Sequence, residues 1–428
     1  MVFHHSLAFA RAVLVHFVVL GHVFRFFEIN SFGLELFDKH QGLSPTVNLL
    51  LLLGHQSVLP ALFFIAGCSG MFGMSRAQTW TSFVGKRARQ LLVPAILAYF
   101  LFVLPKQYVF VDSCQAVELP SLLPNPMKWI SLYFTHCFAS KGFEWLWFAL
   151  LLFLANVLLY PLLSLWHEQT ARELPKLSTC CMVLIMTAGL PILVVSSDLD
   201  AFLWLLASSA GLYLAGAASV AFQLDQVLGF PHFTLRWWLV LLSLLSGLVC
   251  CLPSWDHFQT EPEYMLAEGV FPTYRDGQHR LRFELGKYIW ASLVYLAACR
   301  AEGPEWRSRG NASVFIVRSN PRKGWQKGSL VQSLIVTSPL VFMAHPLPLF
   351  VLAREILAQF GKQNRFGINM VLLILTEYGC LWVICASMVR IPFLDRVFLS
   401  QRSLGEYSLS NSGSGDDSTA GFAKPKVK

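Results

Sequence analysis

The stretch RAVLVHFVVLGH, residues 11–22, places one arginine and two histidines inside the apolar run 6–27. A run of this length can cross a lipid bilayer as a helix, which takes about 20 residues. Ionisable side chains that face lipid are costly, so they usually face the interior of a helix bundle or a wet cavity. The stretch therefore predicts a membrane-spanning helix with a polar stripe on its inward face.

Helix geometry decides which of these residues share the stripe. Arg11 and His22 differ by about 20° around a helix axis and are separated by about 16 Å along it. His16 lies about 140° away from Arg11 on the same helix. Arg11 and His22 are thus expected to share one face, with Arg11 near the inner membrane boundary. Taken singly, Arg11 could instead extend to the cytosolic interface, and His22 could be a hydrogen-bonded packing residue.

The composition supports a membrane protein. Of the 428 residues, 55% are hydrophobic and only 14% are charged, whereas soluble domains average about 25% charged residues. The net charge of +8 does not indicate a nucleic-acid partner, because the basic residues lie in short loops between apolar runs, where positive charge sets topology. We expect an integral, multi-pass protein of the plasma membrane or an endomembrane, with the lipid bilayer as its partner and no nucleic acid.

Ten apolar runs are long enough to be spans, and together they predict an all-α polytopic fold with about ten transmembrane helices. The runs are 6–27, 46–72, 90–106, 144–166, 178–196, 200–221, 235–252, 284–300, 329–353 and 367–390.

The loops between the runs predict the orientation. Residues 73–89 carry four basic residues and no acid, and residues 300–328 carry seven basic and two acidic residues. Residues 28–44 and 253–283 each carry two more acids than bases. Because basic loops stay in the cytosol, both termini are expected to be cytosolic, and only loop 354–366, net +2 on the outer side, disagrees.

Two domains are expected. Residues 1–396 would form the membrane domain, and the Ser/Gly-rich residues 397–428 would form a disordered cytosolic tail that cannot bury a core. No CxxC pair with zinc spacing occurs, so we expect no metal site.

Five segments, taken in order, resemble the acyltransferase 3 family of membrane-bound O-acyltransferases. The first is the Arg11–His22 spacing, which is similar to the family's opening motif. The others resemble its Phe-Phe-x-Ser-Gly, basic-cluster-to-proline, Leu-Trp-Phe and His-Pro-Leu segments: FFIAG (63–67), KRARQLLVP (86–94), LWF (146–148) and LVFMAHPLPLF (340–350).

This resemblance implies transfer of an acyl group, expected to be acetyl, from acyl-CoA to a hydroxyl of a carbohydrate or lipid-linked acceptor. A hydroxyl attacks well only when a base takes its proton, and histidine suits this because its pKa is about 6.5. His22 is therefore the candidate base, and Arg11, on the inner side of the same helix face, is the candidate for phosphate or carbonyl recognition. The chain departs from the family pattern where the family has an acid, a glycine, a serine and a second arginine: Ala8, Ala12, Ala66 and Gln90.

Because Ala8 cannot orient a base, another residue must. Glu377 lies in the middle of the last run, His345 lies at comparable depth in the ninth, and intramembrane carboxylates usually face the bundle interior. A His345–Glu377 contact is therefore predicted, either as part of the catalytic group or only as a link between two helices. Glu144 and Asn156 are weaker candidates for acceptor contacts.

The donor would approach from the cytosol. Lys86, Arg87 and Arg89 lie on the predicted cytosolic side, where they could bind the phosphates of acyl-CoA through charge-assisted contacts. They could equally be positive-inside anchors.

Two other functions fit the same residues. A proton-coupled secondary transporter would use the buried histidines and Glu377 as a proton relay. A non-catalytic acyltransferase-like membrane protein would explain Ala8 and Ala66.

Overall fold

The computed structural model describes residues 5–25, 45–74, 79–110, 144–172, 201–222, 245–247, 249, 277–301, 330–360 and 366–398. Within these ranges every secondary-structure element is a helix. The run 178–196, most of 235–252 and the predicted tail after residue 398 lie outside the described residues.

The elements follow one another along the chain as helices of very different length. They are α1 (His5–Arg25), α2 (Pro45–Met74), α3 (Trp80–Arg87), η1 (Ala88–Leu92), α4 (Val93–Ala98), η2 (Tyr99–Val103), α5 (Leu104–Phe110), η5 (Glu144–Leu146), α9 (Trp147–Leu158), α10 (Tyr160–Arg172), α12 (Ala201–Ala221), α16 (Gly277–Ala301), α18 (Leu330–Ala344), α19 (Pro346–Phe360), α20 (Phe366–Arg390) and α21 (Pro392–Phe398).

The chain is an integral membrane protein with several spans. Four described helical segments are long and apolar enough to cross a membrane, namely Leu7–Phe24, Gln56–Met74, Trp80–Gln107 and Ile368–Met388. A fifth is added if α9 and α10, which are bent by 53° at their junction, count as one span. The count of ten spans and the cytosolic placement of both termini remain predictions.

Two of the predicted run boundaries were wrong. The third span begins at Trp80, not at residue 90, so the basic cluster lies inside a helix. The predicted run 329–353 is two helices, α18 and α19, which meet at His345. A proline follows that histidine, and the residue before a proline is disfavoured in the helical conformation.

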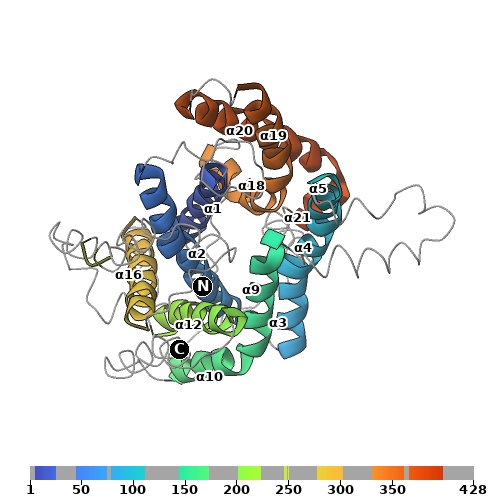
Figure 1. Cartoon of the computed structure of the whole chain (residues 1–428). Coiled ribbons are helices and arrows are strands. Elements are labelled where there is room, and N and C mark those ends of the chain that lie inside the picture. Colours follow the sequence, from blue (N-terminus) through green and yellow to red (C-terminus); the bar gives the residue numbers. More distant parts are fainter. Residues whose placement is uncertain are drawn as a thin grey trace, which may run out of the picture.

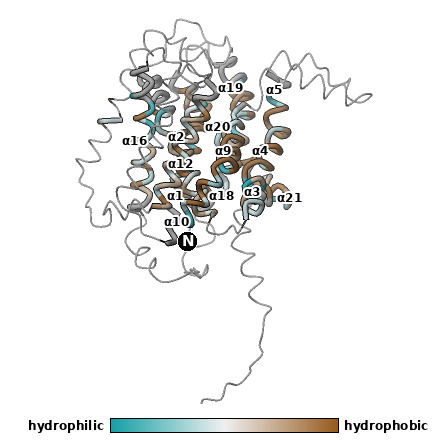
Figure 2. Tube along the Cα trace, turned by 90° about the horizontal axis from the view of Figure 1, so that it is seen from below, coloured by the Kyte–Doolittle hydropathy of each residue, from teal (hydrophilic) through white to brown (hydrophobic). Residues whose placement is uncertain are grey.

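Helix α2 is central to the packing, since it contacts α1, α12 and α16 (Figure 1). A Cβ atom at Gly67 would overlap the backbone of Tyr213, and one at Gly216 would overlap the backbone of Phe64. The two glycines therefore allow the α2 and α12 backbones to approach closely, as small residues do in membrane helix pairs. In the view of Figure 2, the axes of the helices are broadly aligned with one another, and most of the described residues are apolar.

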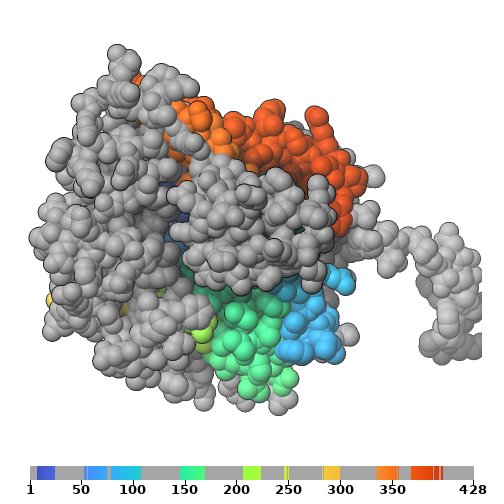
Figure 3. Space-filling view, turned by 45° about the vertical axis from the view of Figure 1, so that its right-hand side comes forward, coloured from blue at the N-terminus to red at the C-terminus, as the bar shows by residue number. Residues whose placement is uncertain are grey.

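The outward faces are apolar as well. On α20, Leu375 is 65% and Trp382 72% exposed, which suits contact with lipid rather than water. The opposite face of α20 carries buried residues at intervals of four, from Asn369 through Leu373 to Glu377. On the surface in Figure 3, α9 and α10 (green) lie beside α3 (blue), in agreement with the contact between α3 and α9.

Candidate active site

Helix α1 places Arg11 and His22 on the side that packs against the bundle. Its fully buried side chains include Ala12, Val19 and Val23, whereas Phe17 is 53% exposed. The Nε atom of Arg11 is buried, and His22 is partly buried. Both ionisable side chains therefore avoid the lipid-facing side of the helix.

His22 forms a hydrogen-bonded pair with His345, which is 0% exposed. The Nδ1 of His22 lies 2.6 Å from the Nε2 of His345. The two rings stack with centroids 4.9 Å apart and planes inclined by 13°. This histidine pair links α1 to the break between α18 and α19, and the two helices α1 and α18 contact one another.

Pro346 explains how His345 is held. In an uninterrupted helix the N–H of residue 346 would donate to the carbonyl of Phe342, but proline has no N–H. The Nδ1 of His345 lies 2.8 Å from that carbonyl oxygen. Because a carbonyl can only accept, Nδ1 carries the proton and donates it there.

The protonation of the pair follows from this bond. With Nδ1 protonated, the Nε2 of a neutral His345 carries no proton and accepts the hydrogen bond from the Nδ1–H of His22. The Nε2 of a neutral His22 is then the unprotonated nitrogen. His345 and the Phe342 carbonyl thus favour the tautomer of His22 in which Nε2 can accept a proton.

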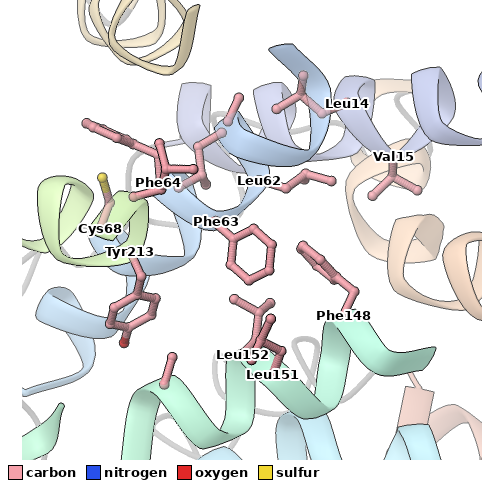
Figure 4. Packing of buried hydrophobic residues seen from close by; sticks show 14 of the residues in the cluster. Leu14, Val15, Leu62, Phe63, Phe64, Cys68, Phe148, Leu151, Leu152 and Tyr213 are labelled. Atoms are coloured by element: carbon pink, nitrogen blue, oxygen red, sulfur yellow. The ribbon is translucent and has the colours of Figure 1, made fainter. Parts of the chain in front are cut away.

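The segments that carry the family resemblance converge on this pair. Phe63 packs against Phe148 with ring centroids 4.7 Å apart, and Phe148 against Phe342 at 5.5 Å (Figure 4). Phe342 in turn lies 6.2 Å from the ring of His345. One continuous series of ring contacts therefore connects three of the motifs, through His345, to the fourth, the Arg11–His22 helix.

A family model described as an acyltransferase domain matches residues 4–385. The chain belongs to the acyltransferase 3 family. This membership makes it a membrane acyltransferase in general terms, and the match includes the histidine pair and the ring contacts described above. A search of curated proteins and a search of solved structures each found no match.

Glu377, the residue considered as a substitute for the family's acid, does not hydrogen-bond to His345. Both carboxylate oxygens of Glu377 are buried, and neither has a hydrogen-bond partner among the residues that the structure describes. The ring nitrogens of His345 contact His22 and the Phe342 carbonyl instead. In this acyltransferase, the side chain in contact with His22 is therefore a second histidine, His345.

The basic cluster of this acyltransferase divides into different environments. Arg87 donates from Nη2 to the carbonyl of Ser69 over 2.7 Å and from Nη1 to Gln90 over 3.2 Å, and its guanidinium lies 5.2 Å from the centre of the Phe83 ring. It thereby ties the C-terminal end of α3 to the backbone of α2. Arg89 is exposed, and Lys86 is partly buried.

Asn156 belongs to the core of the acyltransferase. It is 3% exposed, donates to the Leu152 carbonyl over 2.7 Å and accepts from the hydroxyl of Tyr213 over 2.8 Å. Its polar atoms therefore link α9 to α12. Glu144 begins η5, and its side chain lies outside the described set.

Sequence reasoning missed two groups near the histidine pair. Lys106, at the end of the third span, is 8% exposed and lies against the rings of Trp145 and Phe350. On the other side of α1, the Nδ1 of His16 lies 3.3 Å from the hydroxyl of Tyr378, and the two rings stack. Tyr378 follows Glu377 directly in α20. The signal for Lys106 was a lysine inside an otherwise apolar helix, which also fits an interfacial anchor.

Proposed function

We propose that this acyltransferase moves an acyl group from acyl-CoA to a hydroxyl of a carbohydrate or lipid-linked acceptor, with His22 as the general base. The observation that carries the proposal is the chain of contacts from His22 through His345 to the Phe342 carbonyl. A base that is oriented by a second group, which is held in turn by a third, is the usual arrangement for activating a hydroxyl.

The reaction balances without an acyl-enzyme intermediate. The acceptor hydroxyl oxygen attacks the thioester carbonyl carbon while the Nε2 of His22 takes the hydroxyl proton, which gives a tetrahedral oxyanion. The carbon–sulfur bond then breaks, the carbonyl reforms, and the leaving thiolate takes the proton from the imidazolium of His22. The products are the acylated acceptor and free CoA.

The donor is proposed to lie along α1. Lys86 on α3 and Arg89 on η1 would bind the phosphates of CoA through charge-assisted contacts. Figure 2 shows α3 at the same end of the molecule as the start of α1. The pantetheine arm would then run past Arg11 toward His22, a distance of about 16 Å along the helix. Arg87 supports this end by holding α2 in place.

The proposal is tested with purified protein in detergent or nanodiscs. Wild-type protein should release free CoA from acetyl-CoA when a hydroxyl acceptor is supplied, with a panel of glycans and lipid-linked sugars as acceptors. His22→Ala should lower the rate by about 1,000-fold, as loss of a general base does. His16→Ala is the matched control, because it removes the other histidine of α1, and its rate should stay close to wild type. Normal turnover in His22→Ala would remove His22 from the mechanism.

A proton-coupled carrier is the second candidate, and Glu377 is the observation that favours it. A buried carboxylate with no hydrogen-bond partner in the described residues, beside the His16–Tyr378 pair, has the groups that a proton relay requires. This candidate predicts solute flux in proteoliposomes without thioester consumption. A non-catalytic member of the family would bind acyl-CoA but would neither transport a solute nor consume the thioester.

A further inference from the structure

Lys106 lies in an aromatic cage inside the membrane domain. Its ammonium is 5.1 Å from the centre of the Trp145 ring and 3.9 Å from the centre of the Phe350 ring. The side chain is 8% exposed. Aromatic faces attract an ammonium, so the two rings favour the charged form of Lys106 in a medium that weakly screens it.

Both rings of the cage are connected to the segment around His345. The indole N–H of Trp145 donates to the carbonyl of Met343 over 3.2 Å, two residues before His345. Phe350 lies in α19, which starts directly after His345. The ammonium therefore lies between one ring that is hydrogen-bonded just before His345 and another that follows His345 in α19.

Lys106 is distant from the basic cluster on the same span. Nineteen residues separate it from Arg87 within the helical segment Trp80–Gln107, which corresponds to about 28 Å along a helix. Figure 2 shows α5, which carries Lys106, and α3 at opposite ends of the molecule. The two cationic positions therefore cannot serve the same group of a bound donor.

We propose that Lys106 stabilises the oxyanion that forms on the thioester carbonyl when the acceptor hydroxyl attacks. This inference rests on the proposed function, since the oxyanion exists only in acyl transfer. In the step that His22 assists, the carbonyl π pair moves onto oxygen, and the resulting negative charge is met by an ammonium N–H of Lys106. When the carbonyl reforms and the thiolate leaves, the charge on the oxygen disappears and Lys106 keeps its proton.

The cage suits this role better than ground-state binding of phosphate. A preorganised cation that is held in a water-poor site acts most strongly on charge that develops during the reaction. Free CoA and acyl-CoA carry their full charge on the phosphates, which the proposal places at the opposite end, near Arg89. Lys106 should consequently affect kcat, whereas Arg89 should affect donor binding.

The test compares two variants that each remove one cation. Lys106→Met keeps the length and the apolar stem of the side chain, and it should lower kcat by about 100-fold, as loss of one oxyanion donor does. Its affinity for a non-reactive thioether analogue of acetyl-CoA should stay close to wild type. Arg89→Met is the matched control with the opposite signature: weaker analogue binding and higher donor KM, with kcat little changed. Lys106→Arg keeps the charge and should recover part of the lost rate.

The outcomes separate this inference from the proposed function. If wild-type protein releases no CoA with any acceptor, the proposed function fails and this inference fails with it. If wild-type protein turns over and Lys106→Met has an unchanged kcat, only the oxyanion role is wrong. Equal losses of kcat and analogue affinity would also overturn it, because Lys106 would then bind the donor itself. Should Lys106→Met fail to fold, Lys106→Gln, which keeps an N–H donor, should lose about tenfold in kcat, and an unchanged kcat there again overturns the role.

Discussion

Two buried polar clusters in this molecule handle their ionisable groups in different ways. The histidine pair, His22 and His345, joins α1 to the break between α18 and α19 by one hydrogen bond between two imidazole rings. The α12–α16 cluster is built on an ion pair within α16, between Lys287 and Glu284. Ser208 of α12 contacts both of these side chains, and its hydroxyl donates to Glu284 over 2.8 Å. All three side chains of that cluster are buried.

The difference indicates what each cluster can do. In the α12–α16 cluster the charges neutralise one another and each bond has its donor and acceptor within the cluster, so the group is suited to fixing two helices together. In the histidine pair the bonds to His345 leave the Nε2 of His22 unprotonated, which is the state that a base requires. The first cluster should therefore control stability, and the second should control rate.

The largest effect is expected from Glu284→Ala. This change removes the carboxylate that Lys287 contacts and leaves a buried ammonium without it, which should cost about 3 kcal/mol in the free energy of unfolding. Unfolding in detergent by increasing denaturant measures it. The kcat of the protein that remains folded should be close to wild type.

The double variant Glu284→Gln/Lys287→Met is the control for that prediction. It removes both charges together while keeping similar volumes, so it should recover most of the lost stability. A large fall of kcat in either variant, at temperatures where the protein is folded, would contradict this prediction. The α12–α16 cluster would then contribute to the reaction rate as well as to stability.

The next effect is expected from His345→Ala, which removes the orienting partner of His22. The kcat should fall by about 100-fold, because His22 loses the group that sets its tautomer and ring position. His345→Gln offers a carbonyl oxygen that can accept the same hydrogen bond and should retain more activity. Equal kcat values in the two variants would mean that the hydrogen bond from His22 is not what His345 supplies.

Sequence reasoning found the helix faces better than it found the partners. The shared inward face of Arg11 and His22 follows from helix periodicity, because α1 is one uninterrupted helix. The partner of His22 could not be found this way, since the pairing depends on how α18 packs against α1 over 323 residues of separation. The His345–Glu377 hydrogen bond was expected from equal depth alone, which says nothing about rotation around either helix.

Other misses have similar physical causes. Glu284 and Lys287 were assigned to the start of an uncertain span, although their spacing of three residues already allows a contact on one helix face. Their third member, Ser208, lies on another helix and gives no signal. The break at His345 had a signal in Pro346, but an apolar run that continues through a proline is common in membrane helices.

A smaller effect is expected from Pro346→Ala, which tests how His345 is itself held. Alanine restores a backbone N–H that competes with the Nδ1 of His345 for the Phe342 carbonyl. Because a competing hydrogen bond is worth about 1 kcal/mol, kcat should fall about fivefold. In a His345→Ala background the same change should have no further effect on kcat, and an undiminished effect there would show that Pro346 acts through the helix break and not through the histidine.

The smallest effect is expected from Glu377→Gln, which changes the buried carboxyl group of α20 to an amide. Neither Glu377 oxygen has a hydrogen-bond partner in the described residues, in contrast to Glu284, which has two. A carboxylate kept in this state is suited to accept hydrogen bonds from acceptor hydroxyls, so the substitution should raise the KM for the acceptor about threefold with little change in kcat. Replacing a buried charge by an amide should leave the thermal stability unchanged or higher. If the thermal stability falls while the KM for the acceptor is unaffected, Glu377 has a structural role, as Glu284 does. The histidine pair would then be the polar group that controls the rate.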